Sequence, residues 1–219
     1  MEIIDEFSSD STISNISDSK DSSFLFDSED LLFMQKPNEI TPKIQSITSI
    51  LNLGCSINIK SLSQKIKRSE INLNNKNSLI IKTKDNNIIN NIYPNGKVIS
   101  TGAKSEKEAK SNCIKIAKII KKFGYDISLR DYKIQNIVAN YEINFGLNLN
   151  KLYENICEFH INNYCKYDKN IFPGLIIYIN DINVTIFEAG NIVISGAKNK
   201  KDIEKIFMEI YPLLNEAKT

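Results

Sequence analysis

Apolar and polar positions fall into two blocks with the same order of elements. Each block opens on a β-rich stretch, Ile44–Leu53 in the first and Ile134–Phe145 in the second. A short helix is predicted next, over about Ile59–Arg68 and Leu149–Phe159. Strands separated by turns follow, and a longer helix closes each block. Runs of strands flanked by helices favour an α+β fold, in which helices cover one face of an antiparallel sheet.

The two closing helices have clear end signals. Ser105 and Glu108 form a capping box in the first block, where Gly124 ends the helix. Asn199 caps the second helix. The apolar positions of each helix share one face, which predicts core packing: Ala109, Cys113, Ile116, Ala117, Ile120 and Phe123 in the first, and Ile203, Ile206, Phe207 and Ile210 in the second.

Two dipeptides predict tight turns between strands. Asn95-Gly96 is typical of a hairpin, because both residues accept the positive φ angles that a tight turn needs. Asn180-Asp181 predicts a second turn of this kind, in the other block.

The two blocks are copies of one another. Residues 44–66 align without gaps to 134–156 at an offset of 90, and 93–105 align to 187–199 at an offset of 94. Two copies of this length are too few for a solenoid and fit a pseudo-symmetric domain. We expect a core over 41–219, with repeat one at 42–130 and repeat two at 131–218. Four pairs are identical: Gly96/Gly190, Gly102/Gly196, Ala103/Ala197 and Lys104/Lys198.

Charge is divided unevenly along the chain. Residues 1–40 hold ten acidic residues and two lysines, a net charge of −8, and the remaining 26 basic and 16 acidic residues give 41–219 a net charge of +10. A basic body behind an acidic tail points to a polyanionic partner, although a lysine-rich surface can also be only solvated. The Ser-rich tail 1–40 is predicted to be disordered. Its apolar stretches, Phe24–Phe26 and Leu31–Met34, leave two alternatives: a motif that folds on a partner, or a segment that lies on the basic body.

Other features of the composition argue against several classes of protein. The cysteines Cys55, Cys113, Cys157 and Cys165 lack metal-ligand spacing and His160 is the only histidine, so we expect reduced thiols and neither metal nor cofactor. No apolar run approaches the roughly 20 residues that span a bilayer, and the acidic N-terminus does not resemble a secretory signal. No nucleophile with its base and no phosphate-binding glycine loop is visible, so we expect no catalysis.

One face of the predicted sheet carries no helices, and its residues would normally be polar. Several candidates are instead apolar or small, as is typical of an interface: Ile99, Val138 and Val193, with Thr48, Thr101 and Ser195. Lysines gather on the first long helix and its approach: Lys104, Lys107, Lys110, Lys115, Lys118, Lys121 and Lys122. The sequence therefore predicts a flat apolar surface with basic surroundings.

Several motifs resemble those of the TATA-box-binding protein family. They occur in both halves, in the family's order and spacing over roughly 42–218: Asn52-Leu53-Gly54-Cys55, the Gly-Ala-Lys segments at 102–104 and 196–198, Asp131–Val138, Phe172–Ile176 and Ile210–Leu214. The resemblance implies a pseudo-two-fold saddle, a curved ten-stranded antiparallel sheet with four helices on its convex face and DNA beneath. It also implies a general transcription initiation factor that binds the AT-rich minor groove, bends promoter DNA and nucleates assembly of the initiation complex with the RNA polymerase machinery.

The resemblance also assigns roles to individual residues. Phe172 and Phe187 form one pair of aromatic wedges, while Tyr93 and Lys76 occupy the other two wedge positions. Asn136 reads the centre of the groove. The remaining residues divide by role as follows: Ser46, Thr48, Ile99, Thr101, Val138, Val193 and Ser195 line the groove; Lys82 and Lys97 contact phosphate; Asp168, Asn170 and Ile171 meet initiation factor IIB; and Lys115 and Lys122 meet factor IIA.

Repeat one departs from the family's pattern at Ser46, Thr48, Lys76 and Tyr93. We therefore expect a monomer that bends DNA with a weaker or shifted kink on one side. The alternative is a protein-assembly platform of the same fold, with weakened or altered bending. A base-excision glycosylase is disfavoured, because the two repeats use all of 42–218 and leave no room for a helical domain. The expected location is the nucleus, or a cytoplasmic replication factory or virion if the chain is viral.

Overall fold

A single antiparallel sheet of ten strands forms the centre of the molecule. The computed structural model describes residues 40–67, 69–72, 78–83, 87–158 and 164–219, so the tail up to residue 39 and the wedge position Lys76 lie outside the described residues. The elements are, in chain order, β1 (Lys43–Asn52), α2 (Ile59–Lys65), β2 (Ser69–Asn72), β3 (Ser78–Lys82), β4 (Ile89–Ile92), β5 (Lys97–Ala103), α3 (Glu106–Lys121), β6 (Arg130–Glu142), α4 (Leu149–Glu158), β7 (Tyr164–Lys166), β8 (Gly174–Ile179), β9 (Ile182–Phe187), β10 (Asn191–Ala197) and α5 (Lys200–Glu216).

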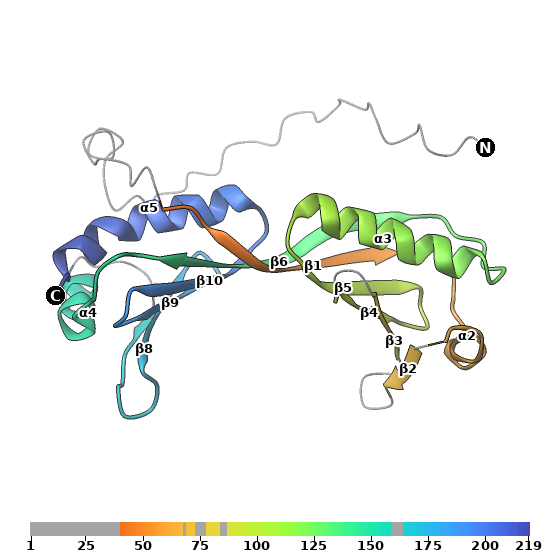
Figure 1. Cartoon of the computed structure of the whole chain (residues 1–219), viewed down its shortest axis with the longest axis horizontal. Coiled ribbons are helices and arrows are strands. Elements are labelled where there is room, and N and C mark those ends of the chain that lie inside the picture. The colour runs from red at the N-terminus through yellow and green to blue at the C-terminus, as the bar shows by residue number, and fades with distance from the viewer. Residues whose placement is uncertain (1–39, 68, 73–77, 84–86, 159–163) are drawn as a thin grey trace.

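The strand order is the same in both halves when it is followed outward from the centre. β1 and β6 are neighbours; β5, β4, β3 and β2 continue from β1, and β10, β9, β8 and β7 continue from β6. Figure 1 shows α3 and α5 along one face, with the outer strands bending away from them, so that the opposite face is concave. All four described helices contribute to cores on the α3–α5 side. The predicted α+β saddle of two repeats is confirmed.

Capping side chains set the starts of the two long helices. The Ser105 hydroxyl accepts a hydrogen bond from the backbone N–H of Glu108 at 3.1 Å, at the start of α3. Asn199 caps α5 in the same way, because its Oδ1 accepts from the backbone N–H of Asp202 at 2.9 Å. Both caps were predicted, and they satisfy N–H groups that a helix leaves unpaired at its start.

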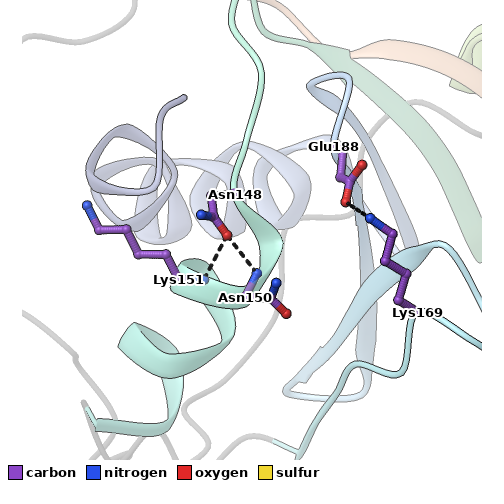
Figure 2. Close-up of polar contacts among 5 residues, drawn as sticks. All are labelled: Asn148, Asn150, Lys151, Lys169 and Glu188. Atoms are coloured by element: carbon purple, nitrogen blue, oxygen red, sulfur yellow. Dashed lines mark hydrogen bonds and ion pairs between the residues drawn. The ribbon is translucent and has the colours of Figure 1, made fainter.

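The two short helices follow the prediction less closely. α2 ends at Lys65 rather than near residue 68. α4 begins with a cap that was not predicted: the Oδ1 atom of Asn148 accepts from the backbone N–H groups of Asn150 and Lys151, at 3.1 and 3.2 Å (Figure 2). Asn148 therefore fixes where α4 begins.

The two predicted turns differ from one another. Asn180 and Asp181, between β8 and β9, have φ angles of 46° and 65°, as predicted. Between β4 and β5 only Gly96 has a positive φ, of 80°, so the positive φ expected at Asn95 is wrong. Pro94 explains the difference, because its ring fixes a negative φ that suits a type I turn, and Gly96 then supplies the bulge residue that follows such a turn.

The core lies between the sheet and the helices, in two clusters. The cluster of repeat two is apolar, and in it the ring of Phe207 on α5 stacks on Tyr141 of β6 with centroids 3.7 Å apart. Leu213 and Leu214 extend this packing toward the end of α5. Close stacking and full burial of large side chains provide most of the stabilisation of this half.

Repeat one buries polar side chains where repeat two buries apolar ones. The Oδ1 atom of Asn90 accepts from the Ser100 hydroxyl and from the Asn112 carboxamide, each at 2.7 Å. These three residues, which we call the helix-side polar cluster, are at most 6% exposed. Their repeat mates, at an offset of 94, are Val184, Ile194 and Ile206. The two halves therefore share a backbone plan but not a core chemistry.

Candidate nucleic-acid interface

Alternation along the strands separates the two faces of the sheet. In β1, the side chains of Ile47 and Ser49 are fully buried on the helix side, whereas Thr48 between them is half-buried on the face without helices, the free face. The same alternation in β5, β6 and β10 brings eight predicted groove residues to this face: Ser46, Thr48, Ile99, Thr101, Asn136, Val138, Val193 and Ser195.

These eight residues are neighbours across the four central strands. Thr48 lies opposite Thr101 on β5 and opposite Asn136 on β6. Val138 lies opposite Ser46 on one side and Ser195 on the other. The hydroxyls of Thr48 and Thr101 are 3.2 Å apart and bond to each other. None of the eight carries a charge, so the middle of the free face is a small-residue, uncharged surface.

The repeated Gly-Ala-Lys segments shape this surface. Gly102 and Gly196 have φ angles of 116° and 106°, and each interrupts the strand register as an extra residue. A Cβ atom at Gly196 would lie 2.8 Å from the carbonyl oxygen of Asp181, so the bulge requires glycine. In repeat two the bulge N–H of Gly196 donates to Oδ1 of Asn136 at 2.7 Å. Because an N–H can bond only to the oxygen, the Nδ2 donors of Asn136 are left for another partner.

The predicted wedge pair lies at the outer part of repeat two. The rings of Phe172 and Phe187 meet edge to face, with centroids 5.9 Å apart, and Phe172 is 38% exposed. Gly174 makes room for this contact, because a Cβ atom there would lie 2.7 Å from Cε1 of Phe172 and 3.1 Å from Cε1 of Phe187. The structure thus brings the two predicted wedge rings together.

A tight turn carries Phe172 on the loop before β8. The carbonyl oxygen of Asp168 accepts from the backbone N–H groups of Ile171 and Phe172, at 3.0 and 2.9 Å. Ile171 is 74% exposed at the tip. Lys169 joins this loop to the β9–β10 turn through an ion pair with Glu188 at 3.0 Å (Figure 2). The hydrogen bond to Glu188 raises the pKa of the Lys169 ammonium. The ion pair links the loop that carries Phe172 to the turn that follows Phe187. Asn170, also in this loop, is exposed.

The corresponding corner of repeat one is less complete. Tyr93 directly follows β4 and is half-buried, and its repeat mate Phe187 is the last residue of β9, the corresponding strand of repeat two. Its expected wedge partner, Lys76, lies outside the described residues. Tyr93 therefore stands as the one described aromatic ring at this corner.

Lysines occupy the ends of the free-face strands. Lys82 ends β3 and is exposed, and Lys97 begins β5 and is half-buried, as expected of rim positions. The sequence analysis missed Lys43 and Lys133, which begin β1 and lie near the start of β6 opposite Asn140 and Ile50. The offset of 90 that relates the repeats also relates these two lysines, and this signal could have revealed them.

Several further free-face residues were not predicted. Asn91 on β4 lies between Ile80 and Ile99, and its repeat mate Thr185 on β9 lies between Ile176 and Val193. Thr185 donates its hydroxyl to Oδ1 of Asn183 at 3.0 Å. These strands flank the central four, so the free face is wider than the sequence analysis predicted.

The opposite, helix-bearing side carries the predicted basic surface. Lys115 and Lys122, with the other lysines of α3, are exposed. The repeat mates of Lys115 and Lys122 on α5 are Glu209 and Glu216. The basic surface therefore belongs to repeat one alone.

We also searched the part of the chain that the structure describes for metal sites, reactive thiols and membrane-spanning helices. Within it, no cluster of three or more His, Cys, Asp or Glu side chains could hold a metal ion. Burial raises the pKa of the Cys165 thiol to about 12, which keeps it protonated and unreactive at neutral pH. No helix in the described ranges has the length and apolar character needed to cross a membrane.

Comparisons with known proteins agree with this geometry. The family model described as transcription factor TFIID (or TATA-binding protein, TBP) matches residues 41–123 and 131–217, once in each repeat. The TATA-box-binding protein of Acanthamoeba castellanii is 36% identical over 184 residues, which cover 83% of this chain and 69% of that protein. The TATA-box-binding protein of Acetabularia peniculus is 32% identical over 182 residues, which cover 82% of this chain and 93% of that protein.

A solved structure shows the same fold. The TBP of Methanococcus jannaschii is 28% identical in sequence and superposes with a TM-score of 0.68, over 81% of this chain and 99% of that one. Three findings point to the same family: the family model matches each repeat, two relatives are similar over most of this chain, and a solved structure has the same fold. This chain belongs to the TATA-binding protein family.

Proposed function

We propose that this chain binds AT-rich double-stranded DNA in the minor groove through its free face, and that it acts as a transcription initiation factor. The observation that carries the proposal is an uncharged, small-residue sheet face with lysines at its strand ends. The minor groove of A·T pairs offers only acceptors, whereas guanine adds an amino group. A close-fitting uncharged sheet selects A·T pairs, because guanine's amino group would be left unpaired against it and because TA steps are easily kinked.

Asn136 would donate a hydrogen bond to a base at the centre of the site. Since Gly196 occupies its Oδ1 atom, its Nδ2 donors are oriented for the acceptors that adenine and thymine present in the minor groove. Ser46, at the mate position in repeat one, has a shorter side chain and a weaker directional preference. We therefore expect the contact at the pseudo-two-fold axis to be stronger on the Asn136 side.

Bending depends on the two ends of the saddle. Phe172 and Phe187 would insert between base steps at one end and partly unstack them, which kinks DNA by roughly 20–90° in known minor-groove binders. Tyr93 offers a ring at the other end. We expect the kink under repeat one to be the weaker of the two.

Fluorescence anisotropy on an AT-rich duplex, at two salt concentrations and beside a matched G·C duplex, tests the binding proposal. We expect tighter binding to the AT-rich duplex and a steep loss of affinity with salt, because phosphate contacts release counterions. Equal affinity for the two duplexes, or no binding to either, would overturn it.

Energy transfer between dyes at the two DNA ends tests bending. Phe172→Ala should reduce the transfer on the bound duplex, because the exposed half of the wedge pair is lost. The matched control is Ile171→Ala, which removes a neighbouring exposed side chain on the same loop without touching the rings. Equal transfer for wild type and Phe172→Ala would show that Phe172 is not a wedge.

Two surfaces are proposed for protein partners in the nucleus. The loop of Asp168, Asn170 and Ile171 would meet an initiation factor IIB, and Lys115 and Lys122 would meet a factor IIA. Mobility-shift assays with DNA and each factor test them: Ile171→Ala should weaken the IIB complex alone, and Lys115→Glu the IIA complex alone. The opposite assignment, or no effect of either variant, would contradict it.

A second candidate function is a protein-assembly platform with altered bending. The Thr48–Thr101 hydrogen bond on the free face of repeat one favours it, since polar groups paired to each other contribute less to DNA contact than apolar ones that pack on the sugars. Recruitment of initiation factors without a bend in the energy-transfer assay would support this alternative.

A further inference from the structure

The two halves of the free face also differ at a matched pair of positions on β4 and β9. Asn91 on β4 lies directly opposite Ile80 and Ile99, and Thr185 on β9 lies directly opposite Ile176 and Val193. Side chains that face one another across antiparallel strands share a face and lie within about 5.5 Å at Cβ. Each half therefore presents one polar side chain framed by two apolar ones.

The hydrogen-bonding state of the two side chains is different. The Thr185 hydroxyl is already used, because it donates to Oδ1 of Asn183 at 3.0 Å. Among the described residues, the carboxamide of Asn91 makes no hydrogen bond, and Asn91 is half-buried. A carboxamide carries two donors and an acceptor, and a ligand that excludes solvent from this face would have to provide their partners.

We infer that Asn91 reads a base edge, and that it lets the half-site beneath repeat one accept a G·C pair. The inference rests on the proposed function. A carboxamide oxygen can accept from the minor-groove amino group of guanine, and its NH₂ group can donate to the acceptors of an A·T pair. Beneath repeat two, Ile176 and Val193 offer guanine no acceptor. The Thr185 oxygen can still accept, but the hydroxyl is held by its bond to Asn183 and reaches less far from the sheet than a carboxamide, so it satisfies guanine's amino group less well.

The consequence is a preferred site of unequal halves. One half-site tolerates G·C pairs beneath Asn91, and the other favours A·T. An unpaired amino group typically costs about tenfold in affinity for each affected base pair. The unequal halves would also favour one orientation of the saddle on DNA.

The test isolates the amino group by using diaminopurine, an adenine analogue that pairs with thymine and carries guanine's minor-groove amino group. Single diaminopurine substitutions are scanned along an AT-rich duplex, and affinities are measured by fluorescence anisotropy. We expect a loss of about tenfold or more beneath one half and less than about threefold at one or two positions beneath the other.

Three variants test whether Asn91 is the residue that makes one half-site tolerate the amino group. Asn91→Leu should raise the loss at the tolerant positions to about tenfold, and the matched variant Thr185→Val should leave the ratios at those positions unchanged. Thr185→Asn should create tolerance in the second half-site, which keeps the inference testable if Asn91→Leu does not fold. Diaminopurine ratios that are the same for wild type, Asn91→Leu and Thr185→Asn would overturn the inference. Wild-type binding that does not discriminate the unmodified AT-rich duplex from the G·C duplex would instead overturn the proposed function.

Discussion

Asn90→Val tests whether the helix-side polar cluster is held together by a single acceptor. Oδ1 of Asn90 accepts from both Ser100 and Asn112, and its Nδ2 donates to the carbonyl oxygen of Ile81 at 3.1 Å. Asn90 itself is fully buried. Valine fills much of the same space but offers no hydrogen bond, so two donors and a carbonyl lose their partner while they stay out of water.

The expected cost follows from these three groups. A buried polar group left unpaired costs about 1–3 kcal/mol, and rotation of the Ser100 hydroxyl toward Cys113, whose sulfur is 3.7 Å from it, relieves part of that cost. We therefore expect Asn90→Val to lower the free energy of unfolding by about 3 kcal/mol. This is a large share of the roughly 5–15 kcal/mol that stabilises a typical domain.

A triple variant separates hydrogen bonding from packing. Asn90→Val, Ser100→Ala and Asn112→Val together remove all three polar side chains, and repeat two packs apolar residues at the same three positions. Because removing both partners of a hydrogen bond is nearly neutral, we expect the triple variant to be about 2 kcal/mol more stable than Asn90→Val alone.

Urea unfolding followed by circular dichroism measures these free energies, with Val184→Ala as the matched variant in repeat two. Val184→Ala should cost about 1–2 kcal/mol from lost methyl burial. If Asn90→Val costs no more than Val184→Ala, or if the triple variant is the least stable of the set, the cluster is not coupled as described.

Three further predictions concern the interface and pH. Gly174→Ala should reduce DNA bending as Phe172→Ala does, because the new Cβ would lie 2.7 Å from the Phe172 ring; unchanged energy transfer would show that the ring contact is dispensable. Lys97→Ala should lower the slope of log affinity against log salt by about 1, with Lys60→Ala on α2 as the control, and an equal change in both would remove Lys97 from the phosphate contacts. Burial raises the pKa of the Glu209 carboxyl above its ordinary 4.5, so the folded state binds this proton more tightly than the unfolded chain does. Stability from this group is present below pH 4.5 and is lost as the pH rises through the raised value; Glu209→Gln should therefore raise the urea midpoint relative to wild type at pH 7 but not at pH 4, and an advantage at both pH values would refute this reasoning.

The fold was largely predictable because its signals are local and occur twice. The caps at Ser105 and Asn199 and the turn at Asn180-Asp181 depend on side chains within three residues of one another. The hairpin at Asn95-Gly96 was predicted correctly, but the positive φ at Asn95 was not found, because Pro94 at the preceding position fixes a negative φ and favours another type of turn.

Of the free face, the residues of the four central strands and the Phe172–Phe187 pair were predicted, but those in the middle of β4 and β9 were not. Alternation says that neighbouring residues face opposite sides, but it does not say which set faces the helices. That choice depends on strand neighbours that are distant in sequence, and on the bulges at Gly102 and Gly196 that shift the register. Asn91 and Thr185 were missed for this reason, whereas Lys43 and Lys133 are related by the repeat and could have been found.

Alternation also places stability and recognition on adjacent residues of the same strand. Asn90 and Asn91 are chemically identical neighbours, yet the first is fully buried beneath α3 and the second lies on the free face. Ser100 and Thr101 divide in the same way on β5. Under the proposed function, a substitution at one residue of each pair would act on unfolding and a substitution at the other on DNA contact, so the two properties of repeat one could change independently. A one-residue shift of register would exchange them, and the glycine bulges that fix the register therefore protect both properties at once.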